Sequence, residues 1–350
     1  MPVSGRNFST NRVDFTGTLS QSEIDSLVAN PDVEILQTSE PLNVKTAQLL
    51  NDRLFSVRTD VELRLYGFYG MICDLSILSF LPNLHRFAAD CLMDATGLEF
   101  IAKQPRLESL TVAVFHLKDF QFLNDLSPQQ LRSLRLGPAK SKRLSLGPLS
   151  RFPGLRQLNI AGHTRDIEVI SILPCLEEVG LCSITVDDLD FLKGLKQLWS
   201  LRLFLGGTRN LAALKDMFGL KYLELCQIRG LDDISVISTL RGLQFLYLRS
   251  LSQVQILPDL SKLKSLRRVL LDTLKGLRDL NPLNKAPALE EFVQFSAPGM
   301  EPADYTDVLK HKSLRRILVG FGSAKKNKAL HDMIIRAGLD EYHHEPFVFV

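Results

Sequence analysis

A short leucine pattern, L-x-x-L-x-L, returns along most of this chain of 350 residues. Clear copies begin at Leu131, Leu155, Leu176, Leu198, Leu220, Leu243, Leu266 and Leu314, and looser copies begin at Leu84, Leu107 and Leu289. From Leu107 to Leu314 successive copies lie 21 to 25 residues apart, with a mean period of 23. A period in this range predicts a solenoid, in which each repeat buries its apolar face against its neighbours.

The second half of each repeat is regular as well. A residue with a short polar side chain, the type that caps helix N-termini, stands ten residues before the first leucine of most copies. These residues are Asp74, Ser145, Asp166, Asp188, Asn210, Asp233, Asp279 and Asp304, with Gly97 in the weakest copy. Apolar residues follow at the spacing of one helical face, as in Ile234, Ile237 and Leu240. Each repeat is therefore predicted to be a short strand, a turn and a capped helical or 3-10 turn.

The period, the strand pattern and the cap together resemble the leucine-rich repeat family. The likeness is closest to its short bacterial type of about 22–23 residues per repeat, as in the internalins, and it covers Asp60 to Val319. It implies an α/β solenoid with a curved parallel sheet on the concave face and short helices or 3-10 turns on the convex face.

One position departs from the family pattern. The family usually has Asn or Cys eight residues after the first leucine, where the side chain bonds the turn backbone. This chain has apolar residues or histidine there: Ile184, Ile228, Leu251, Leu274 and His163. We therefore expect turns packed by apolar groups, with backbone polar groups that pair with one another.

The ends of a solenoid need caps because an open end exposes the core. We expect an N-terminal cap and irregular first coil over residues 1–59, the repeats over 60–320, and a C-terminal helical cap and tail over 321–350. Residues 32–38 and 60–66 are expected to be the irregular first coils of the solenoid, linked by an amphipathic helix around 44–55. Residues 323–337 are expected to form a helix that Gly338 ends. The last residues, 346–350, alternate weakly and are expected to pair with the last strand.

Composition excludes several classes of protein. The net charge is +3 with both signs interspersed, so no field selects nucleic acid or an acidic membrane. The chain has no run of eighteen apolar residues and no apolar stretch near its start, which predicts neither a membrane span nor a secretory signal. Five cysteines without metal-type spacing are expected to be reduced and buried. These features together favour a cytoplasmic protein.

Motifs for catalysis are missing from the sequence. The segment GFGS at 320–323 lacks the rest of a phosphate-binding loop, and neither G-x-S-x-G nor H-E-x-x-H occurs. His331, His343 and His344 are the one conceivable metal set, and a solvated tail explains them better. The sequence therefore predicts no enzyme, no catalytic residues, no cofactor and no metal.

Outward-facing positions of the strands are the remaining candidates for function. Leucines at positions one, four and six of each copy face the core, so positions three, five and seven face outward. In the N-terminal half these positions hold mostly small and polar residues, whereas aromatic residues and arginines gather in the C-terminal half. The predicted partner-binding residues are Arg202, Phe204, Tyr222, Glu224, Phe245, Tyr247, Arg249, Arg268 and Phe295. The alternative interpretation is that the C-terminal cap, or the rings themselves, partly cover this set.

Arginine and aromatic residues are enriched in interface hot spots, so we expect a non-enzymatic module that binds a protein partner of unknown identity. An immunity or inhibitor protein that masks a toxin or enzyme, and a translocated bacterial effector, are the alternatives. A basic cluster lies near the C-terminal end: Lys310, Lys312, Arg315, Arg316, Lys325, Lys326 and Lys328. This cluster has no evident aromatic platform on which bases could stack, which disfavours nucleic acid as a partner. We also expect the protein to be a monomer.

Overall fold

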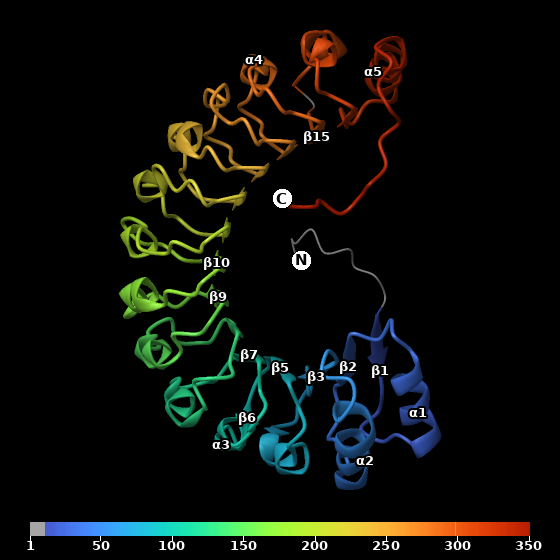
Figure 1. Ribbon diagram of the computed structural model, residues 1–350, viewed down its shortest axis with the longest axis vertical. Coiled ribbons are helices and arrows are strands. Elements are labelled where there is room, and N and C mark those ends of the chain that lie inside the picture. Colours follow the sequence, from blue (N-terminus) through green and yellow to red (C-terminus); the bar gives the residue numbers. More distant parts are fainter. Residues whose placement is uncertain (1–10, 298) are drawn as a thin grey trace. The chain divides into compact units, whose positions relative to one another are not determined.

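Short parallel strands alternate with helical turns throughout the computed structural model, which describes residues 11–297 and 299–350 (Figure 1). The described chain divides into two compact units, a first unit of residues 11–176 and a second unit of residues 177–350. Within each unit neighbouring strands pair in parallel and in chain order. This arrangement, which the 3-10 turns complete, confirms the predicted repeat solenoid.

The sheet of the first unit begins before the predicted first repeat. Its strands are β1 (Arg12–Asp14), β2 (Ile35–Thr38), β3 (Glu62–Tyr66), β5 (Arg86–Leu92), β7 (Ser109–Val114), β8 (Ser133–Leu136) and β9 (Gln157–Ala161), beside the small pair β4 (Cys73–Asp74) and β6 (Ala95–Thr96). Its helical elements are α1 (Gln21–Ala29), α2 (Val44–Leu49), the π-helical η1 (Leu50–Phe55), η2 (Leu75–Phe80), α3 (Glu99–Ala102), η3 (Gln121–Asp125), η4 (Gly147–Arg151) and η5 (Ile167–Ile172).

The second unit repeats the same plan. Its strands are β10 (Glu178–Cys182), β11 (Ser200–Phe204), β12 (Tyr222–Cys226), β13 (Phe245–Arg249), β14 (Arg268–Asp272), β15 (Glu291–Phe295) and β16 (Arg316–Val319). Its helical elements are η6 (Asp190–Leu192), η7 (Ala212–Leu214), η8 (Ser235–Thr239), α4 (Asn281–Asn284), η9 (Pro302–Tyr305), η10 (Val308–Lys310) and α5 (Ala324–Arg336).

The core is built from the repeated leucines, as predicted. In the copy that ends in β13, Leu243, Leu246 and Leu248 are all fully buried. Registers are even along the unit, with Leu246 beside Leu223 on one side and Val269 on the other. These leucine positions fill the core. Stacking of the repeats therefore does not determine which side chains stand at the outward-facing positions between them.

Most of the predicted caps form. The Asp233 carboxylate accepts a hydrogen bond from the Ser235 backbone N–H at 2.8 Å. In the same way, Asp188 and Asn210 each accept a bond from the backbone N–H of the second residue after them. Two predictions are wrong. Asp166 has a left-handed backbone and accepts from the Ser145 hydroxyl instead, and Asp304 lies inside η9, where it accepts from the Glu301 N–H.

Apolar turns pair their backbone groups between repeats, as expected. The N–H of Ser183 donates to the carbonyl of Phe204, and that of Leu205 to Cys226. Each donor has a left-handed backbone, with φ of 54° and 60°, which turns its N–H toward the next repeat. The side chain of Ile184 is buried behind this ladder. Main-chain bonds thus replace the asparagine ladder of the family.

The two helices predicted outside the repeats form. α2 and η1 together fill the predicted helix at 44–55, and Ser323 caps α5, beyond which Gly338 takes a φ of 70°. Residues 32–38 and 60–66, expected as the irregular first coils of the solenoid, each contribute a strand, β2 and β3, and these two strands pair in register. The predicted boundary at residue 60 stays a prediction, although the sheet already begins with β1.

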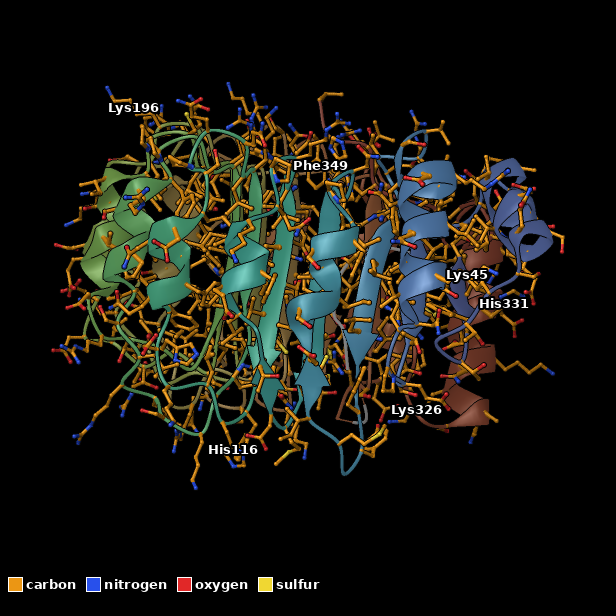
Figure 2. All side chains as sticks on the ribbon, turned by 90° about the horizontal axis from the view of Figure 1, so that it is seen from below. Lys45, His116, Lys196, Lys326, His331 and Phe349 are labelled. Atoms are coloured by element: carbon orange, nitrogen blue, oxygen red, sulfur yellow. The ribbon has the colours of Figure 1, made fainter. Side chains whose placement is uncertain are left out.

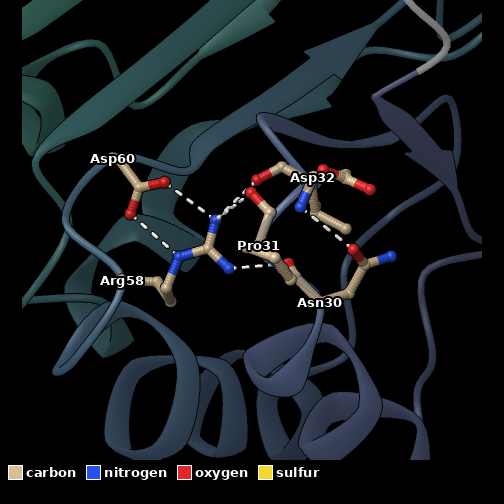
Figure 3. Close-up of polar contacts among 6 residues, drawn as sticks. Asn30, Pro31, Asp32, Arg58 and Asp60 are labelled. Atoms are coloured by element: carbon tan, nitrogen blue, oxygen red, sulfur yellow. Dashed lines mark hydrogen bonds and ion pairs between the residues drawn. The ribbon is translucent and has the colours of Figure 1, made fainter.

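Arg58 fixes the entry into this sheet (Figure 3). Its guanidinium donates to both carboxylate oxygens of Asp60, at 2.9 and 2.8 Å, and to the main-chain carbonyls of Asn30 and Val33, each at 2.8 Å. A weaker bond of 3.4 Å reaches the Pro31 carbonyl. One side chain therefore ties the loop after α1 to the loop before β3.

All five cysteines are free thiols. Burial was predicted for each. It holds for Cys73 and Cys226, but it is wrong for Cys91, which is exposed, and for Cys175 and Cys182, which are half-buried. Cys91 has a φ of 55° where the register of β5 against β7 shifts, and this bulge breaks the inward and outward alternation. None of the helices in the described part of the chain has the length and apolar character that a membrane crossing needs.

Candidate functional site

The side of the β10–β16 strands that points away from the helical turns carries the predicted site, and we call it the strand face. Tyr222, Phe245 and Arg268 stand at equivalent positions of three adjacent strands and are paired in register. The Tyr222 and Phe245 rings meet edge to face at 5.1 Å, and the Arg268 guanidinium lies 5.4 Å from the Phe245 ring. All three side chains are buried.

The chain's own C-terminal tail, residues 341–350, contacts all three of these side chains. The tail leaves α5 and runs along the strand side of the unit (Figure 1, red). The Phe347 ring lies 5.3 Å from Phe245, and the Phe349 ring lies 6.0 Å from Tyr222 and 5.0 Å from Trp199. Among the described residues, the expected pairing of residues 346–350 with β16 is not seen, and one bridge between Arg316 and Asp340 takes its place. That expectation was wrong because the rings find aromatic partners on other strands.

Polar side chains hold the main chain of the tail. Gln244 donates to the Val350 carbonyl at 2.5 Å and accepts from the Val350 N–H at 3.0 Å, as a neighbouring strand would. Arg267 donates to the Val348 carbonyl at 2.5 Å, and Arg268 to the Glu345 carbonyl at 3.1 Å. The tail is therefore held by its backbone as well as by its rings.

An ion-pair chain anchors the start of the tail. Arg316 lies 2.8 Å from the Glu345 carboxylate and 3.4 Å from that of Glu291, which Arg268 contacts at 2.8 Å. Arg316 lowers the pKa of Glu345, and this pairing also raises the pKa of Arg316. The Glu345 carboxylate of the tail is thus joined through Arg316 to Glu291 and Arg268.

The tail follows one edge of the strands. Trp199, Gln244 and Arg267 each come directly before a strand, so their side chains line the edge where strands begin. In Figure 2 Phe349 lies toward the same edge as Lys196, which precedes β11, and Lys326 lies toward the opposite edge. The predicted site residues at the far ends of the strands are consequently left beside the tail rather than beneath it.

The predicted set therefore divides into two groups. Tyr222, Phe245, Arg268 and Glu224 are buried. The other five are half-buried or exposed, namely Arg202, Phe204, Tyr247, Arg249 and Phe295. Arg249 lies 3.1 Å from Asp272, and burial raises the pKa of Tyr247 to about 12. The sequence analysis gave as an alternative that the C-terminal cap partly covers the predicted set. The structure agrees with this alternative for the buried group.

Glu224 is the most unusual member of the site. Its side chain is fully buried, and Tyr222 donates to one carboxylate oxygen, Oε2, at 3.0 Å. The other oxygen, Oε1, has no hydrogen-bond partner among the described residues. Burial raises the pKa of Glu224 to about 7, against the lowering effects of the Tyr222 bond and of Arg202. A buried carboxyl with a raised pKa and an unpaired oxygen favours protonation or a hydrogen bond from a further donor.

Sequence reasoning missed the residues just before the strands, Trp199, Gln244 and Arg267. They occupy position two of the pattern, which simple alternation does not assign to the outward face. Trp199 is the single tryptophan of the chain, and this gave a signal that could have drawn attention to the row. The partner of these side chains, the tail, lies about 80 to 150 residues further along the chain and follows from no local pattern.

Other surfaces offer less. The first unit has an open hollow of about 270 Å³ lined by His85, Arg106, Glu108, Gln130 and Arg132, all in contact with solvent. The loops after β3, β5 and β7 expose Tyr69, Ile72, Met93 and Phe115, an apolar group that the sequence reading missed.

The basic cluster near the C-terminal end is partly neutralised. Lys326 lies 2.7 Å from Glu301 and Lys310 lies 3.2 Å from Asp307. No group of three or more His, Cys, Asp or Glu residues in the described chain is placed to hold a metal ion.

Comparison with known proteins places the fold. No family model matches the sequence, and no curated protein matches it. Among solved structures, an internalin (inlF) of Listeria monocytogenes is similar over 93% of this chain and 95% of its own, with a TM-score of 0.55 and 16% identity. A leucine-rich repeat protein of Leptospira interrogans is similar over 89% and 90%, with a TM-score of 0.52 and 17% identity. The protein therefore has the leucine-rich repeat fold, in the form found in bacterial internalin-type proteins.

Proposed function

We propose that this protein is a non-enzymatic interaction module that binds a protein partner on the strand face of β11–β15. The observation that carries the proposal is the gathering of aromatic rings and arginines at positions that stacking does not constrain. Large, rigid aromatic side chains and arginines supply most of the binding energy at protein interfaces. Their concentration on one face favours recognition over stability as the reason for their presence.

Residues beside the tail offer the surface that a partner can reach first. Phe295 is 40% exposed, and Phe204, Tyr247 and Arg249 are half-buried. Arg249 and Asp272 form a partly exposed pair, whose contribution to stability is small and which is free to exchange partners. The proposal assigns no catalytic step to the protein, and its place in the cytoplasm and its monomeric state remain predictions.

The test is a double substitution, Tyr247→Ala with Arg249→Ala, compared with wild type in capture of partners from a native extract. A matched control changes Thr111→Ala and Arg135→Ala, which occupy equivalent outward positions on β7 and β8. We expect at least one protein to be captured by wild type and control, and about tenfold less by the double variant. Equal capture by all three, with the circular dichroism spectrum intact, would contradict the proposal.

A further inference from the structure

The C-terminal tail lies on the strand face in the way that a bound extended peptide lies on its receptor. Its side chains alternate, since Phe347 and Phe349 contact the rings of the strand face whereas Val348 and Val350 are 71% and 78% exposed. Alternation of this kind is the property of an extended segment, in which successive side chains point to opposite sides.

Two kinds of contact define what the surface accepts. Gln244, Arg267 and Arg268 bind main-chain carbonyl and N–H groups, which every peptide offers. Trp199, Tyr222 and Phe245 contact the two rings, and the Arg267 and Arg268 guanidinium groups lie 4.7 and 5.1 Å from the Phe347 ring. The backbone contacts provide affinity without sequence preference, whereas the ring contacts select aromatic side chains at alternate positions.

The charge at the start of the segment is also specified. Arg316 holds Glu345, which precedes Phe347 by two residues. A peptide with an acidic residue before two aromatic residues thus matches three features of this surface. A basic residue at the same place would lose this ion pair and would face the Arg316 guanidinium group instead.

Several buried polar atoms remain unpaired with the tail in place. Oε1 of Glu224 and the Nε groups of Arg267 and Arg268 have no hydrogen-bond partner in the described structure. A buried donor or acceptor without a partner costs free energy, so a ligand that supplies partners for these atoms gains hydrogen bonds that the tail does not make.

We propose that residues 341–350 are an internal ligand of the strand face, and that the protein partner presents an extended segment with an acidic residue followed by aromatic residues at alternate positions. Tail and partner segment compete for the row formed by Trp199, Gln244 and Arg267. This inference rests on the function proposed above and adds the chemistry of the partner and its control by the tail.

The experiment uses the full chain and a synthetic peptide with the sequence of residues 341–350, blocked at both ends and labelled. One variant empties the surface by Phe347→Ala with Phe349→Ala. The matched control is Val348→Ala with Val350→Ala, which changes the exposed side of the same tail. A third protein adds Trp199→Ala to the emptied variant and removes one ring of the surface.

We expect the emptied variant to bind the peptide at least about tenfold more tightly than wild type or the valine control, because the tethered tail no longer competes at its high effective concentration. Adding Trp199→Ala should weaken this binding about tenfold. A peptide in which both phenylalanines are alanine should not bind.

Equal binding of the peptide to wild type and emptied variant, or no binding to the emptied variant up to about 1 mM, would overturn the inference. Either result leaves the proposed function testable on its own, because the Tyr247 and Arg249 substitutions report on capture of the partner rather than on the tail. If that double variant lost capture of the partner while the peptide did not bind the emptied variant, the proposed function would stand. The inference that the tail is an internal ligand would be wrong.

Discussion

Two segments of this protein are held by arginines that donate to main-chain carbonyls, one in each unit. Arg58 binds the carbonyls of Asn30 and Val33 in the first unit, and Arg267 and Arg268 bind those of Val348 and Glu345 in the second. In both, side-chain donors bind main-chain carbonyls that lie outside the strands. They differ in what else the arginine does.

The two sets of arginine contacts differ in whether the Nε group of each arginine has a hydrogen-bond partner. The Nε of Arg58 donates to Asp60, and this pairing lowers the pKa of Asp60. By contrast, the Nε groups of Arg267 and Arg268 are buried without partners in the described residues. A fully satisfied set of contacts favours a permanent structural role, and an unsatisfied one favours exchange of the bound segment. The predictions below test this difference.

The largest effect is expected from Arg58→Ala. The substitution removes two bonds to Asp60 and the bonds that fix the loop after α1, so we expect a loss of roughly 2–4 kcal/mol in the free energy of unfolding of the first unit. Arg58→Lys is the control, because it keeps the charge but cannot form the planar set of bonds, and it should recover less than half of the loss. Denaturant unfolding measures both. A loss below about 0.5 kcal/mol would show that the Arg58 contacts are dispensable.

The next effect concerns Glu224 and depends on pH. Its pKa is raised from 4.5 in the unfolded chain to about 7 in the fold, so the folded state binds more protons between these values. Stability therefore falls as pH rises through this window, by at most about 3 kcal/mol. Glu224→Gln removes this penalty.

Thermal unfolding of Glu224→Gln should show little change near pH 4.5 and a clear gain in stability at pH 8. The exposed carboxyl of Glu168, changed to Gln, is the control and should show no such pH dependence. A gain that is the same at both pH values would mean that Glu224 does not carry the raised pKa. A loss at pH 8 would mean that the charged form is paired after all.

The repeat made most of the fold predictable. Its period, leucine positions and caps such as Asp233 follow from local spacing, and stacking then requires parallel strands. The failures at Asp166 and Cys91 lie where the backbone is left-handed, and no spacing rule reports a φ value for a residue other than glycine. The local pattern was thus sufficient wherever the strand, the core leucines and the cap recur in the same way in every repeat.

The candidate site was predictable only in part. Alternation assigned Tyr222, Phe245 and Tyr247 to the outward side, because it depends on the strand alone. It could not show that Phe347 and Phe349 would cover two of these rings, since that contact joins segments about 100 residues apart and depends on side-chain geometry. Nor could it assign Gln244, whose role depends on the backbone of the tail.

The smallest effect, confined to the tail, is expected from Gln244→Leu. This change keeps the size of the side chain and removes both bonds to Val350, so docking of the tail should weaken by about 1–2 kcal/mol while global stability changes by less than about 0.5 kcal/mol. Hydrogen exchange of the Val350 amide should become roughly tenfold faster, and that of β12 and β13 should stay constant. Lys221→Leu, the equivalent position one repeat earlier, is the control. Equal exchange of the tail in all three proteins would mean that the two Gln244 bonds do not hold it, and that the rings and the Arg267 and Arg268 bonds are sufficient.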